Sequence, residues 1–392
     1  MRGEEVDVIP FAPRLDLWWL SNKLAGSLPE EYAEMKPDDI SREKGFACYH
    51  MVPDFSNMMR GPEDILHRAL GLYNFRQSAY AFRFPDDVDI EIAEKGGLQT
   101  IDYHTPKGRI RTVGGWTEEM KKQGASLGWT REHAIKGPQD VPALAYIFAN
   151  LEVSENFDGA REYIDEIGDC GVVAVGGASL AASPMHHVQK EFLDPTAFFL
   201  EYVDHYDALA ELAEGVGVYF DKVLDLLCDS PAEVVLWGAN YDDMLTYPPY
   251  FEKEILPWLK KATERLHNAG KLVATHTDGE NKGLMDLIPK SGADVAESLT
   301  PHPMTKVSIG EYYEKWADSM TLMGCIPECI TLRENTDDEQ FEAWLDGLFE
   351  SIKPGRRVIL GIADSTPPNA VMERLDRIAE RIYKEGRLTG GD

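Results

Sequence analysis

The sequence is poor in cysteine and in long apolar runs, and each shortage excludes a class of protein. Its 392 residues include only five cysteines, scattered and odd in number, so we expect no disulfide framework. A reduced, cytoplasmic setting is therefore the expectation. No run approaches the roughly 20 consecutive apolar residues of a membrane span. The charged residues 1–5 lack the apolar region of a signal peptide.

Basic residues are also scarce. The chain has 39 Lys and Arg against 68 Asp and Glu, for a formal net charge of −29. So acidic a surface repels nucleic acid and anionic membranes, and we expect neither as a partner. Hydrophobic residues make up 43% of the chain, which is enough for a sizeable core. The length allows two ordinary domains or one large barrel.

Short apolar runs alternate with helix-like segments along most of the chain. Eight runs have the character of strands: residues 6–10, 45–52, 171–175, 233–237, 272–274, 294–296, 320–323 and 357–360. Helical spacing occurs at residues 141–148, 158–167, 195–203, 206–227, 250–269, 282–288, 338–352 and 371–385. Short, nearly continuous apolar strands are typical of a parallel sheet covered on both faces. The pattern predicts a TIM (β/α)8 barrel, with an open doubly wound sheet as the alternative.

Residues 55–135 interrupt this alternation. They hold a helix-like segment near 64–72 and two strand-like runs, 98–103 and 109–113, on either side of Thr105-Pro106-Lys107-Gly108. A Pro/Gly turn between two such runs indicates a β-hairpin. We therefore predict one barrel domain over residues 1–392, with an insertion at about 55–135 that forms a β-hairpin and helical cap over one mouth.

A polar residue follows each of three successive predicted strands. His276 follows the run at 272–274, Glu297 the run at 294–296, and Cys325 the run at 320–323. The carboxyl ends of parallel strands meet at one edge, where active sites collect. These residue types bind zinc and can leave a coordination position open, whereas a thiolate is a poor magnesium ligand. We predict a zinc site of His276, Glu297 and Cys325, with Asp278 as a competing ligand.

Each of these residues also has an ordinary structural interpretation. The histidine can form a hydrogen bond within a loop, the glutamate can cap a helix or pair with a lysine, and the cysteine can be a small buried apolar side chain. Other polar groups follow the remaining strands and make a crowded acidic rim. We predict that Arg14, Asp16 and His50 bind substrate. Catalytic, substrate-orienting roles are predicted for the residues after the run at 233–237, namely Asn240, Tyr241 and Asp242.

Several segments, in order along the chain, resemble the uroporphyrinogen decarboxylase superfamily, which includes corrinoid-dependent methyltransferases. Residues 23–32 (KLAGSLPEEY) are similar to the decarboxylase segment in which Ala-Gly precedes Leu-Pro-Glu. Residues 105–113 (TPKGRIRTV) are similar to the TPxG hairpin of the methyltransferase branch. Residues 240–257, 324–327 (GCIP) and 366–369 (TPPN) resemble later family segments. The resemblance covers nearly the whole chain and implies a TIM barrel.

Departures from the family pattern favour one branch. The decarboxylases hold substrate carboxylates with two arginines, whose positions here are Lys23 and Ser27. Loss of the guanidinium fork removes bidentate carboxylate recognition, so tetrapyrrole decarboxylation is not expected. The thiol methyltransferases bind zinc through His-x-Cys and a later Cys. Here the first motif reads His276-Thr277-Asp278, and residues 360–363 contain no Cys. A single thiolate leaves zinc a harder Lewis acid, better suited to an oxygen atom.

The resemblance implies the substrate-side methyltransferase of a corrinoid-dependent O-demethylase. Zinc would polarise the ether oxygen of a small methoxylated, aromatic substrate. The methyl group would pass to the Co(I) corrinoid (cobalamin) of a separate corrinoid protein, because the chain lacks the Asp-x-His-x-x-Gly motif that ligates cobalt. The alternatives are methyl transfer between methylcobamide and a thiol, a metal-free decarboxylase, and a non-catalytic binding protein. The sequence does not identify the methyl donor, the direction of transfer or the oligomeric state.

Overall fold

The computed structural model describes residues 1–4, 6–53, 67–73, 78–122, 128–176 and 181–388. The chain divides into two compact units. The first comprises Met1–His50, Tyr163–Ala174 and Glu233–Asp392, and the second comprises Met51–Glu162 and Val175–Ala232. The chain passes between the units within strand β1 (Cys48–Val52), helix α6 (Asp158–Ile167) and strand β8 (Gly171–Gly176), and again between Ala232 and Glu233. The predicted insertion at about 55–135 falls within the second unit.

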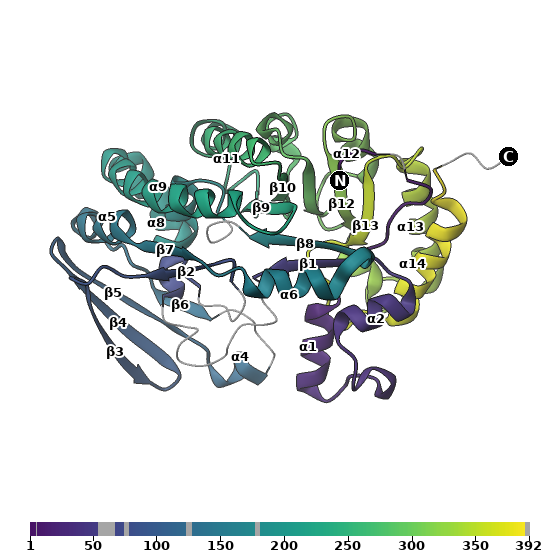
Figure 1. Cartoon of the computed structure of the whole chain (residues 1–392), viewed down its shortest axis with the longest axis horizontal. Helices are drawn as coiled ribbons and strands as arrows, with labels where there is room; N and C mark the ends of the chain where they lie inside the picture. Colours follow the sequence, from purple (N-terminus) through teal and green to yellow (C-terminus); the bar gives the residue numbers. More distant parts are fainter. Residues whose placement is uncertain (5, 54–66, 74–77, 123–127, 177–180, 389–392) are drawn as a thin grey trace. The chain divides into compact units, whose positions relative to one another are not determined.

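The first unit is built on a curled sheet of seven strands, in the order β1-β8-β9-β10-β11-β12-β13 (Figure 1). The last five are β9 (Val234–Ala239), β10 (Leu272–His276), β11 (Val295–Leu299), β12 (Thr321–Ile326) and β13 (Val358–Ile362). Neighbouring strands from β9 to β13 pair in parallel. Seven of the eight predicted strands are thereby confirmed, and the sheet is compatible with a TIM-like barrel.

The predicted first strand, residues 6–10, does not form a regular strand. Phe11 makes an isolated parallel bridge with Leu360 of β13. On its other side the Phe11 carbonyl accepts a hydrogen bond of 2.8 Å from the N–H of Ala47, just before β1. Pro10 and Pro13 have no N–H group, so this segment cannot continue a ladder in either direction. Two backbone hydrogen bonds to Leu360 and one from Ala47 thus link the segment to both edges of the sheet, and full closure of the barrel stays a prediction.

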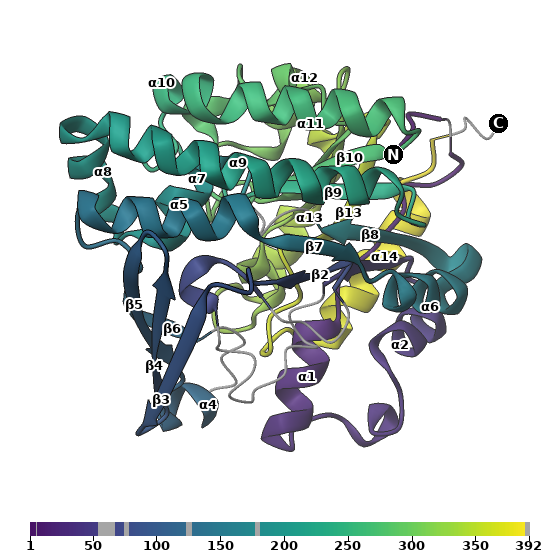
Figure 2. The ribbon, with the colours of Figure 1, turned by 60° about the vertical axis from the view of Figure 1, so that its left-hand side comes forward.

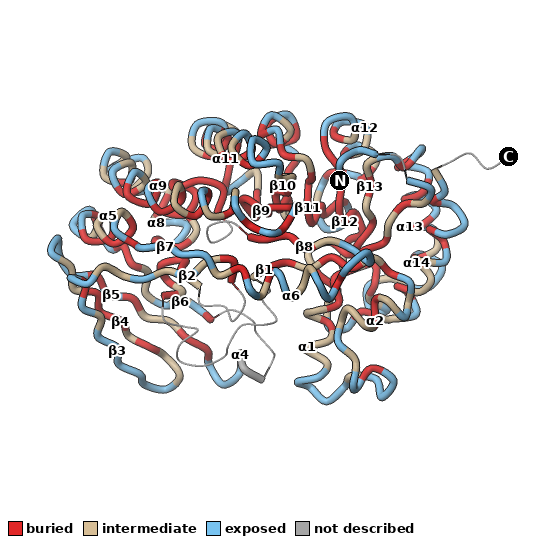
Figure 3. Tube along the Cα trace, viewed as in Figure 1, coloured by how far each residue is buried: buried red, intermediate tan, exposed pale blue. Residues whose placement is uncertain are grey.

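The strands are buried along nearly their whole length, as the red tube in Figure 3 shows. Every residue of β9, β11 and β12 is buried. Helices α11 (Leu256–Asn268), α12 (Ile309–Trp316), α13 (Asp338–Ser351) and α14 (Met372–Glu385) lie along the outside of this sheet (Figure 1). The unit also contains α1 (Asp16–Ala25), α2 (Pro37–Lys44) and α10 (Pro248–Tyr250). Helices outside and strands buried on both faces explain the continuous apolar runs in the sequence.

Two predicted helices of this unit differ from the structure. The predicted helix at 250–269 begins at Pro248 and contains a π-helical turn, η8 (Phe251–Ile255), before α11. Pro257 lacks an N–H donor, which disfavours regular α-helix just before it. The segment predicted as a helix at 282–288 forms short 3₁₀ turns, η9 (Lys282–Leu284) and η10 (Ile288–Ser291). Gly283 and Pro289 weaken a regular helix there.

The second unit contains two antiparallel sheets. One has the order β3-β4-β5-β6, with β3 (Asp89–Lys95), β4 (Leu98–Thr105), β5 (Gly108–Gly115) and β6 (Trp129–Glu132). The other pairs β2 (Tyr80–Arg83) with β7 (Glu152–Glu155). The predicted hairpin is confirmed, because β4 and β5 pair from Leu98↔Gly115 to Thr105↔Gly108. Strands β2, β3, β6 and β7 were not predicted, since much of their surface is exposed and their apolar alternation is weak.

The helices of the second unit include α5 (Val141–Asn150) and α9 (Tyr206–Cys228), which run side by side (Figure 2). Helix α8 (Pro195–Asp204) is also at its predicted position, and α4 (Glu118–Lys122) and α7 (Pro184–His187) are short. Of the helix-like segment predicted near 64–72, residues 64–66 lie outside the described residues. The rest contains the 3₁₀ turn η3 (Arg68–Leu70).

A buried polar cluster holds η3 to the π-helical turn η7 (Val188–Phe192) in the second unit. Arg68 forms an ion pair of 2.5 Å with Glu191, which is 4% exposed. His187 lies beside them, and its Nε2 is 2.9 Å from the carbonyl oxygen of Leu70. Nearby, the Nδ1 of His67 is 3.0 Å from the Tyr103 hydroxyl. Burial lowers the pKa of His67 to about 3 and that of His187 to about 4.

We expect these two histidines to make the second unit sensitive to acid. Their folded-state pKa values lie below the ordinary 6.5. Their contribution to the free energy of unfolding is therefore present above pH 6.5 and is lost as the pH falls towards 4. In this range the two histidines bind protons in the unfolded chain but stay neutral in the folded chain. Between pH 6.5 and pH 5 the loss is about 2 kcal/mol per histidine. Urea denaturation at several pH values measures it.

In the variant His67→Gln, the slope of the free energy of unfolding against pH should be smaller than in wild type, by the amount that corresponds to about one proton. His205→Gln is the matched control, since His205, between α8 and α9, is 49% exposed and forms an ion pair with Glu201. Equal pH slopes in wild type and His67→Gln would contradict the assignment.

Two further findings concern the whole set of described residues. All five cysteines are free, as the sequence predicted. No helix within the described ranges is both long and apolar enough to cross a bilayer.

Candidate functional site

The candidate site lies in the first unit, at the carboxyl ends of the parallel strands. His276 is the last residue of β10 and pairs in register with Glu297 of β11. The Nδ1 of His276 is 2.5 Å from Oε2 of Glu297, and the two residues are 7% and 2% exposed. The backbone N–H of Thr277 donates to the Glu297 carbonyl at 2.7 Å, which locks the register. A buried imidazole and carboxylate are thus held together at the end of the sheet.

The surroundings of His276 favour its charged form. Burial by itself would lower the pKa of the imidazole, but the charge and hydrogen bond of Glu297, together with the charges of Asp364 and Asp278, raise it above its usual value. The Nε2 of His276 is 3.6 Å from Oδ1 of Asp364, which follows β13. Asp278 accepts a hydrogen bond of 2.9 Å from Thr300. The carboxylates around the imidazole therefore favour its positively charged form.

Four residues with left-handed backbone angles mark the same edge of the sheet. Five described non-glycine residues have a positive φ angle, and four of them are Asn240 after β9, Ser298 in β11, Cys325 in β12 and Asp364 after β13. Their φ angles lie between 55° and 70°, in the left-handed region, which Asn and Asp tolerate and which Ser and Cys rarely adopt. Strain of this kind costs roughly 1 kcal/mol or more per residue and clusters at functional sites. This clustering points to function at the strand ends.

The predicted zinc ligands are only partly assembled. His276 and Glu297 touch, whereas Cys325 is fully buried on β12, where it pairs with Gly361 of β13. Burial raises the pKa of its thiol, so a metal would have to displace a tightly held proton. Within the part of the chain that the structure describes, no group of three or more His, Cys, Asp or Glu side chains is arranged to hold a metal ion. The zinc set of His276, Glu297 and Cys325, with Asp278 as competitor, stays a prediction.

The loop after β9 places the three predicted orienting residues differently. Asn240 is exposed, and its side-chain amide donates to Asp278 at 3.4 Å. Tyr241 is fully buried, with its hydroxyl 2.7 Å from Oγ1 of Thr275. Oδ1 of Asp242 accepts the backbone N–H of Met244 at 2.9 Å, which shapes the loop. Asn240 is thus the member of this set that reaches the group around His276.

The predicted substrate-binding residues form two separate contacts. Nη2 of Arg14 is 2.7 Å from Oδ2 of Asp16, and Nη1 of Arg14 donates to the Asp364 carbonyl at 3.2 Å. Arg14 is therefore tied to the group around His276 through the loop after β13. His50, on β1, stacks on Tyr163 with ring centroids 3.6 Å apart. Burial lowers its pKa to about 4, so the ring is neutral at physiological pH.

Sequence reasoning missed two residues of this region. Glu328 follows β12 in the turn η11 (Glu328–Thr331), and burial, reinforced by the charges of Asp364 and Asp278, raises its pKa to about 7. Tyr49 on β1 is 6% exposed, and its hydroxyl has no hydrogen-bond partner among the described residues. Burial and the charge of Glu297 raise the Tyr49 pKa. Neither residue belongs to a motif, because their roles depend on what surrounds them in space.

Comparisons with known proteins show that the fold of this chain is similar to that of a solved structure. No family model matches the sequence, and no curated protein matches it either. A solved structure, a methyltransferase from Methanosarcina mazei, is similar over 98% of this chain and 96% of its own, with a TM-score of 0.52. Sequence identity to that protein is 13%, a level at which the likeness shows the fold alone.

Proposed function

We propose that this chain is a methyltransferase, the substrate-side component of a corrinoid-dependent O-demethylase. The observation that carries the proposal is the buried His276–Glu297 pair at an edge of the sheet where four non-glycine residues hold left-handed backbone angles. Support comes from the methyltransferase of similar fold, which matches over nearly the whole chain. The reaction takes a methyl group from a methoxylated aromatic compound to the Co(I) corrinoid of a separate protein.

The residues of this chain have distinct roles in the proposed reaction. Glu297 fixes the ring of His276 and keeps Nε2 turned to the side of Asp364. Loss of the methyl group leaves an oxyanion on the substrate, which must take up one proton. The pKa of Glu328 is about 7, so its carboxyl group exchanges a proton readily in neutral solution, and we assign it as the donor of this proton. Asn240 and Arg14 orient the substrate. A zinc ion on His276, Glu297 and Cys325, when bound, supplies a Lewis acid that polarises the ether oxygen.

The expected result of metal analysis is about one zinc ion per chain. Elemental analysis of purified wild type, Cys325→Ser and the double variant His276→Ala/Cys325→Ser measures it. Both variants should lose most of the metal. Cys329→Ser is the control, because it removes a less buried thiol of the same region. Full metal retention in the double variant would eliminate the ligand set without touching the methyl-transfer proposal.

The proposed activity is tested with free cob(I)alamin as methyl acceptor. The chain is mixed with reduced cobalamin and a panel of methoxylated aromatic compounds and methylamines, and the conversion of Co(I) to methyl–Co(III) absorbance is followed. We expect conversion with at least one methoxylated donor, and none without the chain. Addition of a corrinoid protein should increase the rate, and salt should weaken its association with so acidic a chain.

Two outcomes would count against the proposal. Methyl transfer from methylcobalamin to a thiol, with no activity on any methoxylated donor, would support the thiol methyltransferase instead. Formation of coproporphyrinogen from uroporphyrinogen would assign the chain to the decarboxylases, in spite of Lys23 and Ser27.

A further inference from the structure

A pocket lies in the first unit at the amino ends of the strands, opposite to the candidate site. It has a volume of about 560 Å³, within the range of small-molecule sites. Its wall includes Thr321 and Val358, the first residues of β12 and β13. His276, Glu297 and Asp364 stand at the carboxyl ends of the same sheet. The pocket is therefore a different place from the candidate active site, and the proposed methyl transfer leaves it unused.

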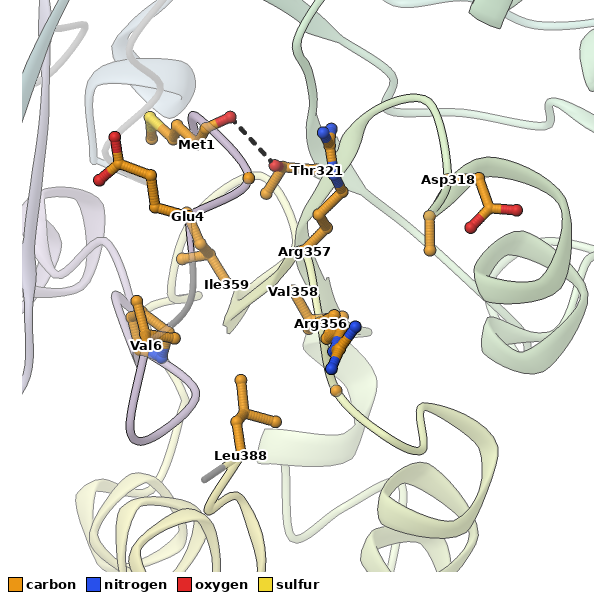
Figure 4. Close-up of a pocket in the computed structure, with 14 residues that line it drawn as sticks. Met1, Glu4, Val6, Asp318, Thr321, Arg356, Arg357, Val358, Ile359 and Leu388 are labelled. Carbon is orange, nitrogen blue, oxygen red and sulfur yellow. Dashed lines mark hydrogen bonds between the residues drawn. The ribbon is translucent and has the colours of Figure 1, made fainter. Parts of the chain in front are cut away.

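Two consecutive arginines, Arg356 and Arg357, line this pocket. Figure 4 shows the Arg357 side chain running through the pocket beside Thr321, with Glu4 and Asp318 on either side. In a chain with a net charge of −29, carboxylates are available to pair with most cations. Arg14, for example, is bonded to Asp16, and Arg381 to three carboxylates.

Arg357 differs from those arginines. Within residues 1–4 and 6–388, as far as they are described, its guanidinium forms no hydrogen bond and no ion pair, although the residue is half-buried. A partly desolvated guanidinium without an anion destabilises the folded state, because its five N–H donors lose hydrogen bonds to water and form none to the protein. An oxyanion bound in the pocket would satisfy these donors through a two-pronged contact.

The backbone gives a second, independent reason. Arg357 is the fifth described non-glycine residue with a positive φ angle, at 55°. Its carbonyl accepts a hydrogen bond of 2.8 Å from the N–H of Leu322, which holds it in this conformation. Glycine or asparagine would adopt this angle at lower cost. Strain kept at an unpaired arginine indicates that the side chain has a function.

We propose that this pocket binds a small oxyanion, the phosphate or carboxylate group of a metabolite, on the guanidinium of Arg357. Arg356 adds positive charge, whereas the hydroxyl of Thr321 already donates to the carbonyl oxygen of Met1 at 3.4 Å. Glu4 and Asp318 offset the charge of the two arginines, so the pocket disfavours polyanions and selects a singly or doubly charged ligand that carries its own hydrogen-bond donors. Val358 and Leu388 give an apolar wall for the rest of the molecule.

The test uses thermal melting of the full chain with inorganic phosphate or acetate, at an ionic strength kept constant with chloride. We expect a saturable rise of the melting temperature for at least one of the two anions. A response to phosphate alone indicates a phosphoryl ligand, and a response to acetate alone indicates a carboxylate ligand. No saturable response to either anion would overturn the proposal.

Variants show whether the anion binds at Arg357. Arg357→Asn tolerates the left-handed backbone and should weaken apparent anion affinity at least tenfold, as expected for loss of a two-pronged charged contact. Arg161→Asn is the control, because it removes the same charge from an exposed pair with Asp158 and should leave the affinity unchanged. If Arg357→Asn does not fold, Asp318→Asn provides the test, with an expected severalfold increase in affinity. An unchanged response in Arg357→Asn, or in Asp318→Asn when that variant replaces it, would show an adventitious ion only.

Discussion

Replacing His276 by alanine should lower the rate of methyl transfer to cob(I)alamin by about a thousandfold and destabilise the fold by about 3 kcal/mol. The Glu297 carboxylate, 2% exposed, would lose the imidazole that lies 2.5 Å from it and remain buried without its main partner. Glu297→Gln should lower the rate by a similar factor with a smaller loss of stability, because the amide keeps the shape and the hydrogen bond. The cobalamin absorbance assay and urea denaturation measure the two effects.

The chain contains a matched control for this experiment. Nε2 of His267 is 2.8 Å from Oδ2 of Asp294, which makes a second His–carboxylate pair near the amino ends of β10 and β11. These side chains are 40% and 25% exposed, and such surface pairs contribute about 0–1 kcal/mol. His267→Ala should therefore leave both the rate and the stability nearly unchanged. If His276→Ala behaved like His267→Ala, the buried pair would not be the centre of the active site.

The largest expected loss of stability in the second unit comes from Gly71→Ala. Gly71 ends η3 with a φ angle of 64°, and a Cβ atom there would lie 2.6 Å from Cε1 of His187 and 2.6 Å from Cγ of Glu191. The clash would push apart the buried cluster that includes the Arg68–Glu191 ion pair. We expect a cost of about 3 kcal/mol, from overpacking and left-handed strain together. The free energy of unfolding in urea measures it.

Gly26→Ala separates the two causes. Gly26 ends α1 with a similar φ angle of 70°, but nothing lies within 4 Å of the position of its Cβ atom. Its substitution should cost only the left-handed strain, about 1 kcal/mol. Equal losses in the two variants would mean that the cluster around His187 yields to the added methyl group.

The sequence by itself determined where most elements lie. The apolar runs at 233–237 and 320–323 predicted strands, and β9 and β12 lie there and are buried at every position. The hairpin of residues 98–115 is equally local, because a Pro/Gly turn joins two strands that pair directly. The first strand was predicted wrongly for a local reason as well, since Pro10 and Pro13 cannot donate to a ladder.

Only the tertiary structure decided which polar side chains meet. His276 and Glu297 are 21 residues apart and touch because β10 and β11 pair in that register, which depends on packing along both strands. The left-handed backbone of Cys325 and Arg357, and the burial that raises the pKa of Glu328 to about 7, likewise arise from neighbours remote in sequence. The position of a strand follows from the pattern of apolar residues, which depends only on residues close together in the sequence. Contact, strain and desolvation are set by three-dimensional packing.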